Sequence, residues 1–98
     1  MAIRHVVVMR FRDGTTPEAV QALTDGLRAL PAVIPEIVDY RVGPDLDLAD
    51  DSWDFAVSAD FDGVDDFRTY RSHPAHVKVI EELILPHLEV RHSVQFDL

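Results

Sequence analysis

The chain has 98 residues, of which 47% are apolar, and 18 acidic against 9 basic side chains give it a formal net charge of −9. This length suits one hydrophobic core, and the negative charge argues against nucleic acid or an anionic membrane as a partner. The sequence contains no cysteine, so disulfides and thiolate catalysis are excluded. Since it shows neither a membrane-length apolar run nor a signal-peptide layout, we expect one cytoplasmic domain over residues 1–98.

The first segment, Ile3 to Arg12, alternates in the manner of a β-strand. One predicted face carries Ile3, His5, Val7, Met9 and Phe11, and the other carries Arg4, Val6, Val8 and Arg10. Both faces contain apolar residues, so we expect the second face to be covered too, by another subunit. Arg4, Arg10 and Arg12 form a local basic cluster that could bind a small anion.

A helix is predicted to start at Thr15-Thr16-Pro17-Glu18, which supplies a hydroxyl cap and an early proline, and to run to about Leu30. Its predicted buried stripe consists of Ala19, Ala22, Leu23, Leu27 and Leu30. After a loop that contains two prolines, a second strand is predicted over Ile37 to Val42, closed by Gly43-Pro44.

The stretch from Pro44 to Ser52 is acidic and irregular. Its aspartates could offer oxygens to a hard cation, but the glycine and terminal glutamate of a calcium loop are missing. We therefore interpret it as a solvated loop. Trp53 to Phe61 then alternates as a third strand, whose apolar face is predicted to carry Trp53, Phe55, Val57 and Ala59.

Two short helices are predicted next, one from Asp62 or Gly63 to about Arg71 and one from Pro74 to Pro86, because Pro74 suits the first turn of a new helix. Tyr70, His73 and His76 gather at their junction. On the second helix His76 shares a face with Ile80, Leu83 and Ile84, so its imidazole is predicted to point inward. We expect His73 to cap this helix, which disfavours a metal site built from His73, His76 and His5.

Leu88 to Leu98 alternates as a last strand, with Val90, His92, Val94 and Phe96 on one side. If the two short helices count as one interrupted crossing, the element order is the ferredoxin-like pattern of α+β proteins, a four-stranded antiparallel sheet with helices on one face. The other face must be covered, so we expect a homodimer in which two sheets pack face to face.

Two stretches carry a resemblance to a known family: Ile-Arg-His-Val-Val-Val-Met-Arg-Phe at residues 3–11 and Tyr-Arg-Ser-His-Pro-Ala-His-Val at residues 70–77. With the order of elements, they resemble the stress-responsive A/B barrel proteins along essentially the whole chain. The resemblance implies a dimeric α+β barrel in which each subunit keeps a small pocket between its sheet and its helices.

The family includes a plant polyketide cyclase that performs an intramolecular aldol condensation without a cofactor. The resemblance implies His76 and Tyr70 as the catalytic pair, with His76 as general acid/base and Tyr70 as its hydrogen-bond partner or as a donor to an enolate. It also implies a substrate pocket walled by His5, Val7, Met9, Leu27, Phe55 and Ile80, with no cofactor and no metal. At Phe55 and Leu27 the chain departs from polar pocket residues of that cyclase, which makes the expected pocket more apolar.

Three functions stay open on these residues. The first is a cofactor-independent, cyclase-like enzyme acting on a carbonyl substrate. The second is a stress-associated dimer that binds a small hydrophobic or carbonyl ligand without turnover, and the third is a cofactor-free monooxygenase. For His76 the alternative to catalysis is a core histidine satisfied by a backbone carbonyl, and His5 either binds substrate or bonds Tyr70.

Overall fold

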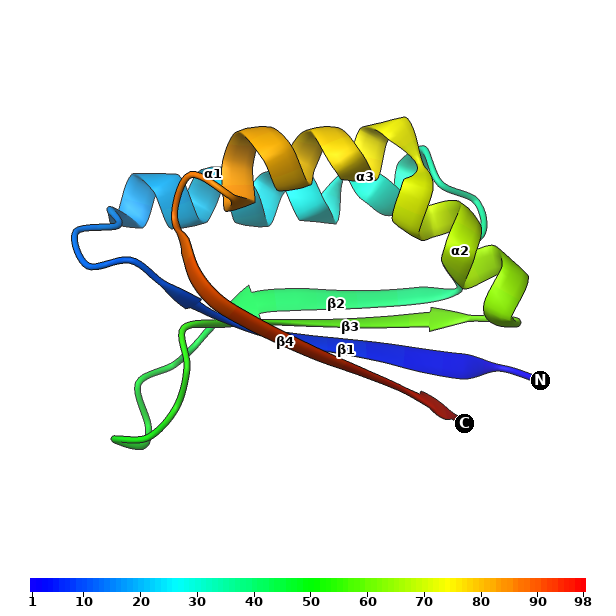
Figure 1. Ribbon diagram of the computed structural model, residues 1–98, viewed down its shortest axis with the longest axis horizontal. Coiled ribbons are helices and arrows are strands. Elements are labelled where there is room, and N and C mark those ends of the chain that lie inside the picture. The colour runs from blue at the N-terminus through cyan, green and yellow to red at the C-terminus, as the bar shows by residue number, and fades with distance from the viewer.

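The computed structural model describes residues 1–98 and consists of a four-stranded antiparallel sheet with helices packed on one face (Figure 1). The strands are β1 (Ile3–Phe11), β2 (Asp39–Pro44), β3 (Phe55–Phe61) and β4 (Leu88–Asp97), in the spatial order β2-β3-β1-β4. The helices are α1 (Pro17–Arg28), α2 (Val64–Ser72) and α3 (Pro74–Val79), with a short 3-10 helix η1 (Leu30–Ala32) and a π-helical segment η2 (Ile80–Ile84). The predicted ferredoxin-like arrangement is confirmed.

Strand β1 is central because both of its edges are paired. Its register places His5 opposite Ala59 of β3 and opposite Gln95 of β4. Burial alternates along the strand as predicted, and the five residues of the helix-facing side are all buried: Ile3, His5, Val7, Met9 and Phe11. The alternation therefore directs His5 into the space between sheet and helices.

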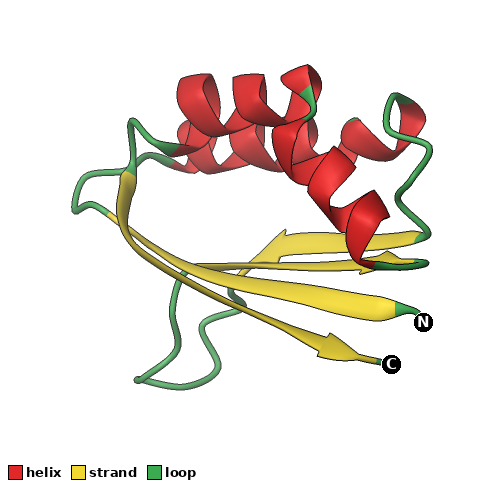
Figure 2. Ribbon diagram, turned by 45° about the vertical axis from the view of Figure 1, so that its right-hand side comes forward, coloured by secondary structure: helices red, strands yellow, loops and turns green.

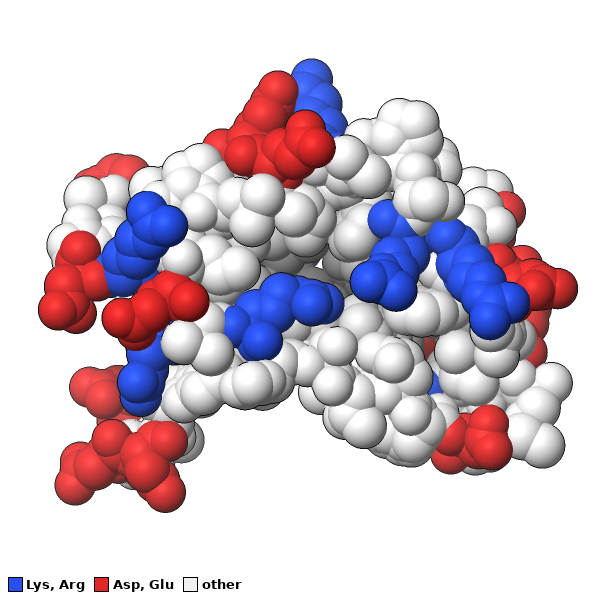
Figure 3. Space-filling model, in the orientation of Figure 1, with Lys and Arg blue, Asp and Glu red and all other residues white.

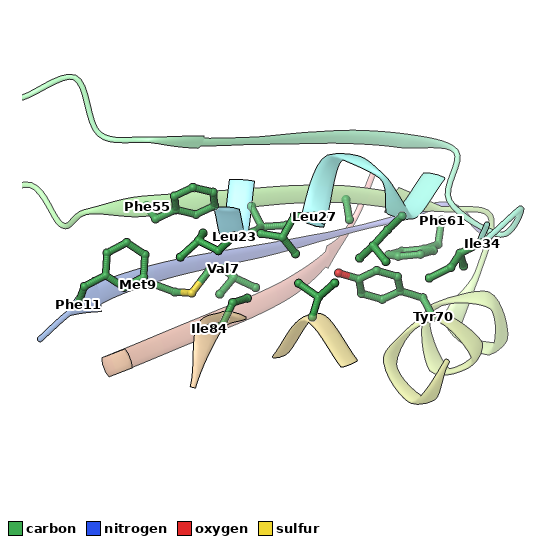
Figure 4. Packing of buried hydrophobic residues seen from close by; sticks show 14 of the residues in the cluster. Val7, Met9, Phe11, Leu23, Leu27, Ile34, Phe55, Phe61, Tyr70 and Ile84 are labelled. Atoms are coloured by element: carbon green, nitrogen blue, oxygen red, sulfur yellow. The ribbon is translucent and has the colours of Figure 1, made fainter. Parts of the chain in front are cut away.

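The hydrophobic core lies in that space and comprises 15 buried residues. Figure 4 shows α1 contributing Leu23 and Leu27, which meet residues of β1, β3 and the second helical layer. The predicted stripe on α1 is wrong at Ala22, which is exposed, while Thr24 is buried. Thr24 can be buried because its hydroxyl donates to the carbonyl of Val20 at 2.7 Å.

The third strand begins two residues later than predicted, at Phe55. The Asp54 carboxylate accepts from the backbone N–H of Phe11 at 2.8 Å, which ends the alternation there. Trp53 accordingly does not share the apolar face with Phe55. Its ring stacks on His92 at 5.3 Å, on the helix-free face of the sheet. The second strand is also displaced, since β2 begins at Asp39.

The last helical segment changes geometry where it packs against α1. The α-helical hydrogen bonding of α3 ends at Val79, and the chain continues to Ile84 as a π-helix, before the predicted end at Pro86. A glycine in α1 permits a close approach, because a Cβ at Gly26 would lie 2.7 Å from Cδ1 of Leu83. Figure 2 shows these two helical layers side by side above the sheet.

The other face of the sheet carries no helix, and the loop between β2 and β3 projects on that side. Apolar side chains remain accessible on it, with Val8 38%, Phe96 45% and Val94 56% exposed. The basic cluster expected near the N-terminus is not formed. Arg4 pairs with Asp60 at 2.7 Å, while Arg10 lies over the ring of Trp53. No helix is long and apolar enough to cross a membrane.

Two glycines test the backbone demands of this fold. Gly14 has a φ of +87° in the turn after β1, and nothing lies within 4 Å of a Cβ added there. We expect Gly14→Ala to lower the free energy of unfolding by about 1 kcal/mol, through backbone strain alone. Gly43→Ala, which also meets open space but has no positive φ, should leave stability unchanged or slightly raised. Urea unfolding of both variants measures this, and equal midpoints would contradict the strain argument.

Candidate functional site

The site is organised by the break between α2 and α3. Pro74 has no N–H, so it cannot extend α2, and it occupies the first turn of α3. The backbone N–H of Ala75 donates to Nδ1 of His73 at 3.1 Å, which confirms His73 as the cap of α3. In an uninterrupted helix that N–H would have bonded the carbonyl of Arg71. The cap therefore leaves the Arg71 carbonyl available to another donor.

The imidazole of His76 forms a hydrogen bond with that carbonyl. Its Nδ1 lies 3.1 Å from the carbonyl oxygen of Arg71. A carbonyl only accepts, so Nδ1 carries the proton and Nε2 of the neutral ring is left with a lone pair. The predicted hydrogen bond between Tyr70 and the imidazole is absent, since the two rings instead pack in a tilted arrangement, with centroids 4.2 Å apart and planes inclined by 37°. The orienting partner of His76 is thus the backbone, with Tyr70 as its packing support.

The Tyr70 hydroxyl bonds to a residue that the sequence had not indicated. Tyr40 of β2 places its own hydroxyl 2.9 Å away, and the two rings meet edge to face. Tyr70 is buried, and Figure 4 shows its hydroxyl turned into the core cluster. Two hydroxyls share one hydrogen bond between them, so one proton of the pair remains free to donate elsewhere.

His5 completes the group from the sheet. It is only 6% exposed, and Nδ1 lies 2.8 Å from Nε2 of Gln95 on the neighbouring strand. The amide nitrogen donates, so the imidazole proton is on Nε2. His5 does not bond Tyr70, although the two rings lie 6.3 Å apart, and it also packs against Phe67 at 4.9 Å.

The two imidazoles face one cavity in different protonation patterns. No protein group bonds Nε2 of His5 or of His76, yet no buried polar side-chain atom lacks a partner, so both atoms reach accessible space. Both residues line the same cavity. His5 therefore presents an N–H donor to this cavity, and His76 presents a lone pair. A hydrogen-bond donor and a base face the same small volume.

This cavity has two parts. The inner part has a volume of about 50 Å³ and is mainly apolar, lined by His5, Val7, Met9, Leu27, Val57, Tyr70, His76, Ile80, Ile84, Leu85, Leu88 and Arg91. It shares His5, Tyr70, His76, Ile80, Leu85 and Arg91 with an outer vestibule of about 330 Å³, to which Arg71, Val77 and Glu81 also contribute. Figure 3 shows this side of the molecule as a hollow flanked by basic side chains.

Of the eight residues singled out in the sequence, the structure brings seven together around the inner cavity. They are His5, Val7, Met9, Leu27, Tyr70, His76 and Ile80. Phe55 is the exception, because it lies in the core with its ring 6.1 Å from that of Phe11 and is not part of the lining. Phe55 stands at the start of β3, close to the loop that joins β2 to β3 and away from the cavity. Val57 lines the cavity from β3 instead.

Sequence reasoning missed three polar residues near the site, Tyr40, Arg91 and Gln95. The positions of Arg91 and Gln95 could have been predicted, because they alternate with His92 and Val94 and so must lie on the helix side of β4. Tyr40 had no comparable signal, because only the tertiary structure brings its hydroxyl to that of Tyr70. No group of three or more His, Asp or Glu side chains is arranged to hold a metal ion.

Burial sets the protonation of the site. Desolvation, reinforced by the charge of Arg91, lowers the pKa of His5 to about 4. Desolvation also lowers the pKa of His76, against the opposing effect of its bond to the Arg71 carbonyl. Burial raises the pKa of both Tyr40 and Tyr70. At neutral pH the site therefore holds two neutral imidazoles and two neutral phenols.

Comparison with known proteins places this chain in a family. Residues 3–98 match the family model described as Stress responsive A/B Barrel Domain. The chain belongs to this A/B barrel family. The recognition made from the two sequence stretches is confirmed.

Several A/B barrel relatives are similar along most of the chain. Olivetolic acid cyclase of Cannabis sativa is 28% identical over 79 residues, 79% of this chain and 78% of that protein. The domain-containing protein HS1 of Arabidopsis thaliana is 26% identical over 78 residues, 78% of this chain and 72% of that protein. A dimeric ferredoxin-like protein of unknown function from Thermobifida fusca superposes with a TM-score of 0.93 at 46% identity, covering 100% of this chain and 92% of that one.

The lowered pKa of His5 makes a prediction about stability. The folded-state pKa, about 4, lies below the value of about 6.5 for an unfolded chain, so the unfolded state binds the proton first as the pH falls. Stability from His5 is complete above pH 6.5 and is lost between pH 6.5 and pH 4. We expect this loss to be at most about 3 kcal/mol.

Urea unfolding at pH 7.5 and pH 4.5 measures the effect. His5→Gln, which cannot titrate, should lose less stability on acidification than the wild-type protein does. His87→Gln provides the control, since it removes a histidine outside the cavity lining. Equal losses in the wild-type protein and His5→Gln would show that His5 is not held neutral by the fold.

Proposed function

We propose that this A/B barrel protein is a cofactor-independent acid–base enzyme that removes a proton next to a carbonyl group. The observation that carries the proposal is the complementary pair of imidazoles, one presenting N–H and the other a lone pair to one cavity. A base and a hydrogen-bond donor within one small site are what the formation of an enolate needs.

In the proposed step, Nε2 of His76 accepts the α-proton while the C–H electron pair moves into the enolate. The developing negative charge on oxygen is stabilised by Nε2–H of His5 and by the free proton of the tyrosine pair. In this arrangement Tyr40 donates to Tyr70, which keeps the Tyr70 hydroxyl proton available to the substrate. The enolate carbon then attacks a second carbonyl, whose oxygen becomes an alkoxide and takes the proton from His76. Without a second carbonyl, the enolate carbon takes that proton back.

Two features support a carbonyl substrate over a nucleophilic or hydrolytic reaction. The cavity contains no serine, threonine or carboxylate at its inner end, whose lining is mostly aliphatic. The similarity to olivetolic acid cyclase supports a cyclisation of this type, while the aliphatic wall at Leu27 supports a less polar substrate segment than a fully hydroxylated pocket would take.

The catalytic assignment can be tested by hydrogen exchange. We expect the protein to accelerate exchange of the α-hydrogens of butanone in D₂O, followed by NMR, and cyclisation of a linear 3,5-dioxo thioester. His76→Gln should remove about 10²-fold or more of the acceleration, since it deletes the general base. Tyr70→Phe should remove a smaller part, because His5 remains as a donor. The rate should be level above neutral pH and fall in acid as His76 is protonated.

A neighbouring histidine supplies the control. His73→Asn keeps a good helix cap but removes an imidazole outside the cavity lining, so its exchange rate should equal that of the wild-type protein. Exchange that survives His76→Gln would overturn the assignment of the base. Binding of a ketone without exchange or cyclisation would instead support the non-catalytic ligand-binding dimer.

We also propose that the protein is a homodimer through the helix-free face of its sheet. Val8, Val94 and Phe96 leave this face apolar and accessible in one chain. Covering such a face with a second copy would remove it from water, and the Thermobifida fusca relative is described as dimeric.

Light scattering tests the dimer. We expect a mass of twice the 11.1 kDa of one chain for the wild-type protein. Val94→Asp should shift the mass to that of one chain, because an unpaired charge would be buried in the interface. Val33→Asp, a change at an equally exposed valine on the helical side, should remain dimeric. A wild-type mass near 11 kDa would contradict the proposal.

A further inference from the structure

Two arginines stand at the outer vestibule without partners. Arg71 ends α2 and Arg91 lies on β4, on the helix side with Met9, and both line the vestibule. Three ion pairs occupy other arginines, between Arg4 and Asp60, Arg41 and Asp39, and Arg68 and Asp65. Neither guanidinium of the vestibule takes part in an ion pair or a side-chain hydrogen bond, so ten N–H donors are free there.

The charge of this rim is opposite to that of the chain. Glu81 is the only acidic residue of the vestibule, so the rim carries a net positive charge while the whole chain carries −9. Figure 3 shows the same contrast, with basic side chains at the hollow and acidic ones toward the periphery. A local positive rim in an acidic protein attracts anions to one place and repels them elsewhere.

The two arginines act on the catalytic histidines as well. Both lower the pKa of His5 and of His76 through their charge, after the larger effect of burial. The guanidinium groups and the imidazoles also line the same vestibule, so one small ligand can reach both, although no hydrogen bond joins them.

The dimensions of the site limit that ligand. The vestibule volume of about 330 Å³ equals that of roughly eleven waters at about 30 Å³ each. The inner cavity of about 50 Å³ adds space for one or two more atoms of an apolar end. A compact molecule fits, with its anionic group in the vestibule and its reacting part at the histidines.

We propose that Arg71 and Arg91 bind the carboxylate of a small keto acid, whose ketone lies at His5 and His76. A planar carboxylate matches the planar fork of a guanidinium, and two such forks can hold its two oxygens. This assignment rests on the proposed function for the ketone end of the ligand, whereas the carboxylate end rests on the two arginines. It makes the substrate class acidic, where the proposed function alone admits neutral ketones.

Binding of 5-oxohexanoate and of its methyl ester, followed by NMR titration, tests the proposal. The two probes share the ketone and differ in the charge, so the acid should bind at least about ten-fold more tightly at low salt. Arg71→Gln and Arg91→Gln should each weaken binding of the acid about ten-fold and leave the ester unchanged. Glu81→Gln should tighten binding of the acid, because it removes the negative charge of the vestibule.

Arg68→Gln is the matched control, since Arg68 lies on the same helix but outside the vestibule and pairs with Asp65. It should bind the acid as the wild-type protein does. Equal binding of acid and ester, failure of both to bind, or an equal loss in Arg68→Gln would overturn the proposal. Equally tight binding of inorganic phosphate would overturn it too, by showing a general anion site.

The proposal fails separately from the proposed function. His76→Gln should remove about 10²-fold or more of the hydrogen exchange in 5-oxohexanoate and should keep the preference for the acid over the ester. Exchange without any preference for the acid would support the acid–base site and contradict the role of the arginines. Preference for the acid without exchange would support the arginines and contradict the base.

Discussion

The hydrogen bonding at the break before Pro74 is the constraint on which the site depends. Pro74 cannot extend α2, and His73 captures the N–H that would otherwise satisfy the carbonyl of Arg71. The released carbonyl then fixes the ring of His76 and its proton. One local feature of neighbouring residues thus gives the imidazole of His76 a defined orientation and tautomer, and the ring of Tyr70 packs against it.

The rest of the site combines buried side chains with others that solvent can reach. The core removes His5, Tyr40 and Tyr70 from water, which holds them neutral at physiological pH. Edge strand β4 receives no helix of its own, so its inner side stays open and carries polar residues such as Arg91 and Gln95. The cavity forms where the closed and open regions meet, which allows neutral imidazole and phenol groups and charged guanidinium groups to face the same small volume.

Much of this could be predicted from the sequence because it depends on local periodicity. Alternation along β1 placed His5, Val7 and Met9 on the core side, and helical spacing turned His76 inward. The boundaries were less accurate where a side chain competed with the backbone. The Asp54 carboxylate took a strand N–H and moved Trp53 to the opposite face, and a π-helix replaced the last α-helical turns after Val79.

The sequence by itself determined the fold class, the family and the residues that would come near one another, since periodicity, turn residues and two motifs are properties of neighbouring positions. Only the tertiary structure decided how those residues bond. Tyr70 pairs with Tyr40, 30 residues away, and His5 pairs with Gln95, 90 residues away. The two free arginines line one vestibule only because β4 returns beside β1, which brings Arg91 to the side of the sheet that the helices cover. Hydrogen-bond partners and charges across a pocket depend on distances in space, and no spacing along the chain encodes them.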